Sequence, residues 1–90
     1  MRNVKLADGT VYPVDRCGAA DGLLIINVTI DDDLLDIVLK FGHPENVTRI
    51  EHYFDGTETD HTYFDGYTEL TAVYGTQTGT TVNLRRDTHG

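Results

Sequence analysis

The stretch from Thr48 to Tyr74, TRIEHYFDGTETDHTYFDGYTELTAVY, decides how this chain folds. Aromatic and β-branched residues that alternate with polar ones are typical of half-buried strands, and polar segments that contain glycine are typical of turns. The pattern predicts three strands, 48–54, 61–64 and 67–74, separated by a hairpin loop and a bend at Gly66. Because the stretch holds two of the four histidines and four of the five tyrosines, we expect any localised site here.

Adjacent aromatic residues in these strands must face opposite ways. Side chains alternate along a strand, so Tyr53 and Phe54 point to different faces of the sheet. If one face packs on the core, the other carries exposed aromatic rings, which suit contact with a ligand or another subunit. Ordinary cross-strand packing is the alternative. The candidate binding or interface residues are Tyr53, Tyr63, Tyr67, His52 and His61.

The residues before this stretch predict three more strands. Asp8-Gly9 supplies the positive-φ pair of a type I′ hairpin turn, which would set Leu6 opposite Val11. Residues 16–22 read as a connection. The apolar run 23–30 is typical of a central strand that is covered on both faces.

One helix is expected at about residues 31–41. Its apolar stripe, which would face the sheet, is Leu34, Leu35, Val38 and Phe41. The aspartates at 31–33 suit the positive end of the helix dipole. Gly42 fits a left-handed C-cap, and Pro44 fits a stop signal.

These elements, with a last strand over 80–86, give the order β-β-β-α-β-β-β-β in a single domain, residues 1–90. One helix on a largely antiparallel sheet is an α+β fold. The sheet is either open or a small, partly closed barrel.

Composition excludes several classes of function. The formal net charge of -8 argues against nucleic acid and against anionic membrane surfaces, because both need clustered basic residues. No apolar run approaches the roughly 20 residues of a membrane span, and the N-terminal residues lack an apolar signal core. We therefore expect a cytoplasmic protein. Cys17 is the only cysteine, so no internal disulfide is expected.

A metal site depends on the register of the hairpin. If His52 pairs with Tyr63, His52 and His61 share a face about 7–8 Å apart, and a shift of one residue puts them on opposite faces. Zinc would need a third ligand, with Asp60 or Glu51 as the candidates. No Cys/His spacing motif is present, so we expect no metal and no cofactor.

Catalytic motifs are missing from the sequence. The chain has no serine and no glycine-rich phosphate loop. Cys17 beside Arg16 is the one candidate thiol nucleophile, and no His-Asp order accompanies it. Counted from Asp55, the position at which an EF-hand calcium loop needs glutamate is Gly66. We expect no catalytic residues and no enzymatic activity.

Four segments resemble small proteins encoded by phages and prophages of Gram-positive gut bacteria. They are LADGTVY (6–12), RCGA (16–19), RIEHY (49–53) and FDGYTEL (64–70). The resemblance implies a virion or tail-assembly component that works as repeated copies, and it implies no particular site residues. The leading expectation is a non-enzymatic phage structural or assembly component, acting through self-association or contacts with other phage structural proteins. The alternative is a small-ligand or carbohydrate-binding module with Tyr53, Tyr63 and Tyr67 as its platform.

Overall fold

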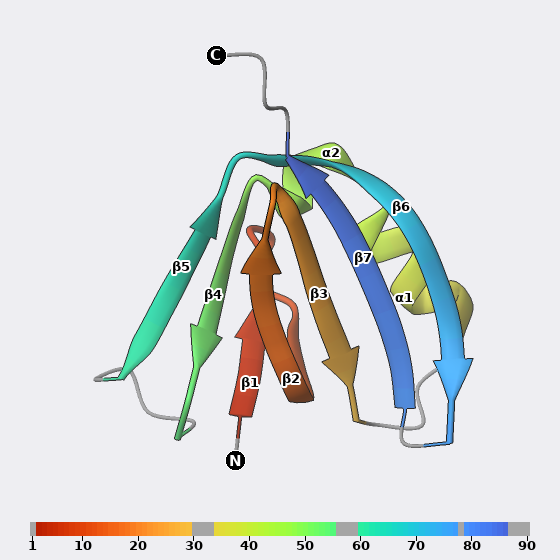
Figure 1. Cartoon of the computed structure of the whole chain (residues 1–90), viewed down its shortest axis with the longest axis horizontal. Helices are drawn as coiled ribbons and strands as arrows, with labels where there is room; N and C mark the ends of the chain where they lie inside the picture. Colours follow the sequence, from red (N-terminus) through yellow and green to blue (C-terminus); the bar gives the residue numbers. More distant parts are fainter. Residues whose placement is uncertain (1, 30–33, 56–59, 78, 87–90) are drawn as a thin grey trace.

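The computed structural model describes residues 2–29, 34–55, 60–77 and 79–86, and Figure 1 shows their arrangement. Within them, seven strands form one antiparallel sheet in the order β5-β4-β1-β2-β3-β7-β6, with two short helices on one side of it. The strands are β1 (Arg2–Lys5), β2 (Val11–Ala20), β3 (Leu23–Val28), β4 (Arg49–Tyr53), β5 (His61–Asp65), β6 (Tyr67–Thr76) and β7 (Gly79–Arg86). The helices are α1 (Leu34–Phe41) and α2 (Pro44–Val47).

The α+β class and the predicted succession of seven strands along the chain are confirmed. In the described part of the chain β5 and β6 form the two edges and do not pair with each other, so the sheet is open rather than a barrel. The aspartates expected at the start of the helix lie outside the described residues. Pro44 begins α2, because the fixed φ of proline and its missing N–H suit a first helical turn. The sequence had predicted Pro44 only as a stop signal after α1, and α2 was not predicted.

Gly42 does not form the predicted left-handed C-cap. It is not among the residues with positive φ, and its N–H donates a 2.8 Å hydrogen bond to Val38 O, which continues the pattern of α1. The chain then passes through His43 into α2.

The hairpin between β1 and β2 pairs one residue away from the predicted register. Lys5, rather than Leu6, lies opposite Val11. Only the glycine of the Asp8-Gly9 pair has a positive φ, +94°, whereas a type I′ turn needs two. The Asp8 carboxylate instead accepts a 2.9 Å hydrogen bond from Thr10 N–H, which holds a longer turn. The shift places Val11 on the exposed face, 53% exposed.

β2 continues through residues that were predicted to be a connection. It runs to Ala20, and the Asp21-Gly22 pair, with positive φ at both residues, turns the chain into β3. A register shift between Val14 and Arg16 marks a bulge in the pairing of β2 with β3. The pairing of β2 with β1 ends at Val14, just before this bulge. β3 is interior, as predicted, but only one of its faces is covered, because Ile25 is 44% exposed.

Gly66 alone separates β5 from β6, although these two strands form opposite edges of the sheet. Its φ of +85° lies in the region that favours glycine, and its N–H donates a 2.8 Å hydrogen bond to Thr48 O. Figure 1 shows the strands drawn together at this end and spread apart at the other. The bend predicted at Gly66 is therefore where the chain crosses from one edge to the other.

The core lies between the sheet and the helices. Its buried hydrophobic residues are Val4, Leu6, Tyr12, Val14, Leu24, Ile26, Val28, Ile37, Phe41, Val47, Ile50, Tyr67, Val82 and Leu84. Val82 and Leu84 face inward, as predicted. The predicted stripe of α1 is wrong except for Phe41, because Ile37 is the other buried residue of this helix. Apolar residues surround most of α1, so their spacing alone did not select the buried side.

Candidate functional site

Three aromatic rings contact one another on the exposed face of β4 and β5. Tyr53 lies opposite His61, with ring centroids 5.3 Å apart. The His61 and Tyr63 rings meet edge to face, with centroids 4.5 Å apart. We call Tyr53, His61 and Tyr63 the aromatic ladder. The outward aromatic face that the sequence predicts is present, and three of the five candidate residues form it.

Two charged residues of β4, Arg49 and Glu51, contact the rings of the ladder. The Arg49 guanidinium carbon lies 4.1 Å from the centroid of the Tyr63 ring, and Arg49 Nε lies 3.9 Å from Glu51 Oε1. The Tyr53 hydroxyl donates a hydrogen bond to the Glu51 carboxylate. One side of the Tyr63 ring is therefore covered by a guanidinium, an arrangement that cross-strand packing and cation–π attraction explain.

His52 lies on the opposite face and belongs to the core. It pairs with Thr62 rather than Tyr63, so His52 and His61 do not share a face. The side chain is 1% exposed, and its ring centroid lies 4.4 Å from that of Phe54. Burial, together with the positive charge of Arg2, lowers the pKa of His52, which favours the neutral ring. Its Nε2 has no hydrogen-bond partner among the described residues.

Tyr67 is also buried, so the platform predicted from Tyr53, Tyr63 and Tyr67 is wrong. Tyr67 is 1% exposed, and the Arg86 guanidinium carbon lies 5.6 Å from its ring centroid. Burial raises the pKa of Tyr67. Since the two hairpin histidines face opposite ways, they do not assemble the zinc site considered for them. No cluster of three His, Cys, Asp or Glu side chains in the described part of the chain is placed to hold a metal ion.

Cys17 packs against the core rather than forming a reactive thiol. Burial raises the pKa of Cys17 to about 12, outweighing the positive charge of Arg2. Cys17 pairs with Ile26 and Arg16 pairs with Asn27, so the Arg16 charge lies on the other face of the sheet. A thiolate nucleophile needs a lowered pKa, which this environment does not provide.

A cavity of about 450 Å³ opens on the outer face of β2 and β3, a feature that the sequence analysis missed. Its lining residues are Asp15, Arg16, Ile25, Asn27, Thr76 and Thr81. Asn27 Nδ2 donates a 3.0 Å hydrogen bond to Thr81 Oγ1. The polar residue Asn27 inside an apolar run was the one sequence feature that could have indicated this cavity. The bulge that brings Asp15 and Arg16 to the same cavity has no recognisable pattern in the sequence.

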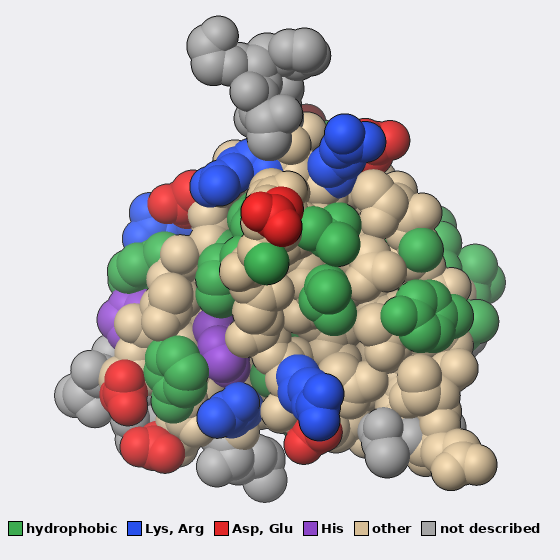
Figure 2. Space-filling model, viewed as in Figure 1, with side chains coloured by type: hydrophobic (Ala, Val, Ile, Leu, Met, Phe, Trp, Pro, Cys, Tyr) green, Lys and Arg blue, Asp and Glu red, His purple; other side chains and the backbone are tan. Residues whose placement is uncertain are grey.

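Four large apolar side chains of α1 face solvent. Leu34 is 47%, Leu35 62%, Val38 37% and Leu39 61% exposed, and together they are called the α1 apolar surface. Figure 2 shows hydrophobic side chains gathered on the side of the molecule where Figure 1 places β6 and α1. Three of the four, Leu34, Leu35 and Val38, belong to the stripe that the sequence predicts to face the sheet, and the structure exposes all three.

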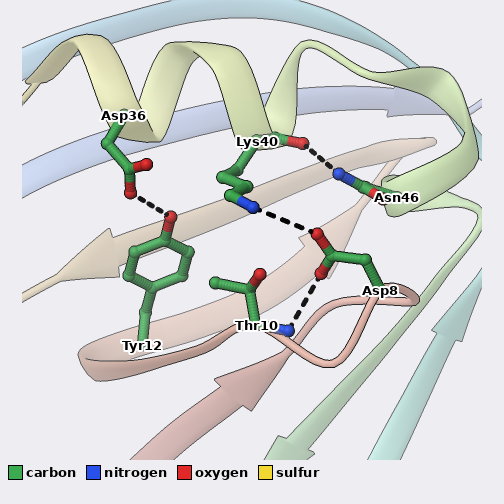
Figure 3. A network of polar contacts seen from close by, with 6 residues as sticks. All are labelled: Asp8, Thr10, Tyr12, Asp36, Lys40 and Asn46. Carbon is green, nitrogen blue, oxygen red and sulfur yellow. Dashed lines mark hydrogen bonds and ion pairs between the residues drawn. The ribbon is translucent and has the colours of Figure 1, made fainter.

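Polar contacts hold another side of α1 on the β1–β2 hairpin (Figure 3). The Tyr12 hydroxyl donates a 2.9 Å hydrogen bond to Asp36 Oδ2, and Lys40 Nζ lies 3.5 Å from Asp8 Oδ2. The hydrogen bonds from Thr10 and the Lys40 charge lower the pKa of Asp8. With Asp36 and Lys40 directed at the hairpin, the apolar surface of the helix is directed at solvent.

No protein-family model, no curated protein and no solved structure matches this chain. Within the described residues, none of the helices has the length and apolar character needed to cross a membrane.

Proposed function

We propose that the protein is a non-enzymatic structural or assembly component of the phage or prophage type, and that it binds a second copy of itself through the α1 apolar surface. The observation that carries the proposal is the exposure of Leu34, Leu35, Val38 and Leu39 on a helix of only eight residues. The phage setting, in the host cytoplasm or in a virion, rests on the resemblance of the four sequence segments.

The α1 apolar surface has the physical properties of a contact surface. A surface helix normally directs polar residues at solvent, and here those positions carry leucine and valine. Burying one such side chain contributes about 1.5–3 kcal/mol, so four of them supply a driving force for association. Contiguous exposed apolar surface of this kind marks interaction sites in soluble proteins.

A second copy is the occupant that fits this surface best. The four side chains carry no charge, and an apolar stripe is complementary to itself across a two-fold axis. Strand addition is less favourable, because the β5 edge has five residues and the β6 edge has two register shifts. The net charge of -8 opposes association at long range, but salt screens it beyond about 8 Å. Other phage structural proteins are the alternative partners.

Sedimentation velocity over a range of protein concentrations tests the proposal. The wild-type protein is expected to dimerise, and more strongly at high salt, because salt screens the repulsion between two acidic copies. The double variant Leu35→Ser/Leu39→Ser should be monomeric. Val11→Ser, which removes an equally exposed apolar side chain from the sheet, is the matched control and should dimerise as wild type does.

Two results would contradict self-association through α1. One is a strictly monomeric wild-type protein at every concentration and salt. The other is a dimer that the double variant leaves intact. Dimerisation that weakens with salt would likewise indicate a charged rather than an apolar contact. Circular dichroism of both variants establishes that they are folded.

A second candidate function is the binding of a small ligand or carbohydrate at the aromatic ladder. The observation in its favour is three contacting aromatic rings on an exposed face, with Tyr63 44% exposed. A ligand-induced increase in melting temperature should then be lost in Tyr63→Ser. It should persist in Leu39→Ser, which removes an exposed apolar side chain from α1, away from the aromatic ladder.

A further inference from the structure

A row of side chains crosses β2, β3, β7 and β6 on the outer face of the sheet, the face away from the helices. These side chains belong neither to the core nor to the α1 apolar surface. Tyr74 lies opposite Thr81, Thr81 opposite Asn27, and Asn27 opposite Arg16. Paired residues of neighbouring strands share a face, so the row presents a phenol ring, a hydroxyl, an amide and a guanidinium in order across four strands. The cavity of about 450 Å³ lies on this row.

The bulge in β2 adds a carboxylate to the same place. The register shift between Val14 and Arg16 brings two consecutive side chains, Asp15 and Arg16, to the cavity. Neither forms an ion pair or a side-chain hydrogen bond with another described residue. Their charges cancel, so the cavity has no net charge with which to select an anion or a cation.

The floor of the cavity holds a polar group with an incomplete set of hydrogen bonds. Thr81 is 8% exposed, and its hydroxyl accepts the bond from Asn27 Nδ2. Asn27 Oδ1 is enclosed and has no partner in the described part of the chain. Turning the amide over would pair its oxygen with the Thr81 hydroxyl and leave the nitrogen without a partner instead. In either orientation one polar atom of Asn27 lacks a partner among the described residues, and such groups are rare enough to need an explanation.

We infer that this cavity is a binding site for a neutral, hydroxyl-rich ligand, a saccharide. The amide of Asn27 and the hydroxyl of Thr81 each donate and accept hydrogen bonds, as sugar hydroxyls do. Arg16 adds hydrogen-bond donors and Asp15 adds acceptors, which can form charge-assisted hydrogen bonds with neighbouring hydroxyls of the sugar.

Apolar surface and size agree with the same class of ligand. Ile25 is 44% exposed in the cavity wall, and Tyr74, 51% exposed at the end of the row, offers a ring to the C–H side of a sugar. The volume lies within the range of about 300–1,000 Å³ that is typical of small-molecule sites. In Figure 2, charged side chains lie at the upper ends of β3 and β7 and, lower down, over β2, and the surface between these two groups is uncharged.

Amide chemical shifts of the isotope-labelled chain, titrated with the methyl glycosides of glucose, galactose, mannose and N-acetylglucosamine, test the inference. We expect saturable shifts at Arg16, Ile25, Asn27 and Thr81 with at least one glycoside. Arg16→Ala and Tyr74→Ser should each raise the dissociation constant by about tenfold, the loss expected for a charge-assisted hydrogen bond or a stacked ring. Arg85→Ala, an exposed arginine on the same face but outside the cavity, should leave it unchanged.

Three results would overturn the inference. The first is no saturable shift with any of the four glycosides. The second is shifts confined to the aromatic ladder, which would place the sugar at the other candidate surface. The third is saturation by glycine, a zwitterion that fits the Asp15 and Arg16 pair, with none by the glycosides. The site is independent of self-association, so Leu35→Ser/Leu39→Ser should bind glycosides as wild type does.

Discussion

The Tyr12 hydroxyl donates a 2.9 Å hydrogen bond to Asp36 Oδ2, and this contact sets which side of α1 faces the sheet. The Tyr12 ring also stacks on Phe41, with centroids 5.6 Å apart. One buried tyrosine thus holds the helix at a polar residue and at an apolar one. With these two sides of the helix occupied, the leucines on the remaining side face outward.

Replacing Tyr12 with phenylalanine should lower the free energy of unfolding by about 1–2 kcal/mol. The ring and its contact with Phe41 are kept, so the loss reports the interactions of the hydroxyl, among them its hydrogen bond to Asp36. Urea denaturation measures the change, with Tyr74→Phe as the control, because that side chain is 51% exposed. If Tyr12→Phe is as stable as wild type, this hydrogen bond does not orient α1.

Gly66→Ala should also destabilise the fold, by about 1–2 kcal/mol, because its φ is +85°. An added Cβ would lie 3.2 Å from Arg86 Cδ, a contact that the long arginine side chain relieves by moving. Gly75→Ala is the matched control, since φ is not positive there and no atom lies within 4 Å of an added Cβ. Thermal unfolding of the two variants compares them. Equal stability would mean that the chain crosses between the edges without strain.

The free energy of unfolding should depend on pH through the titration of His52. Burial and the Arg2 charge hold its pKa below the ordinary value of 6.5 in the folded protein, whereas the unfolded chain keeps that value. The unfolded chain therefore binds more protons between the two pKa values. The free energy of unfolding should fall as the pH drops through 6.5 toward the folded pKa, by at most about 1.4 kcal/mol per pH unit.

His52→Phe removes this titration and keeps an aromatic ring beside Phe54. Urea denaturation of both proteins across this pH range should give a flatter profile for the variant. Profiles that run parallel would show that His52 does not contribute to the pH dependence.

Cys17 should react slowly with iodoacetamide while the protein is folded. Its pKa of about 12, against an ordinary value of 9.0, lowers the thiolate fraction at about pH 8 by roughly a thousandfold. Mass spectrometry follows the labelling, and unfolding in urea should restore the rate of a free cysteine. Rapid labelling of the folded protein would show that the thiol is accessible and ionised.

The sequence predicted the elements far better than their registers. Strand patterns identified the seven strands because β-branched and aromatic residues alternate with polar ones along them. The register at Asp8-Gly9 depended on whether one or both residues adopt a positive φ, and sequence does not distinguish these turns. A shift of one residue then exchanged the faces of Val11 and its neighbours.

The candidate site was predicted in part for the same reason. Tyr53, Tyr63 and His61 share the exposed face because Tyr53 pairs with His61, a register one residue away from the pairing of His52 with Tyr63 that was considered from the sequence. The faces of His52 and Tyr67 depended on the hairpin register and on the bend at Gly66, which no local pattern determines. The cavity beside Arg16 needed the bulge in β2, and the exposure of the α1 leucines needed the contact between Tyr12 and Asp36.

The single residue between β5 and β6 also bears on how the sheet assembles. The hairpins β4–β5 and β6–β7 are local, whereas the pairings of β1 with β4 and of β3 with β7 join distant segments. Once one hairpin docks on the β1–β2–β3 meander, Gly66 holds the other at a high effective concentration near the opposite edge. Lengthening the chain at Gly66 should therefore slow folding and leave the unfolding rate nearly unchanged. The short connection thus speeds the pairing of distant strands, which is the slowest step in a fold of this topology.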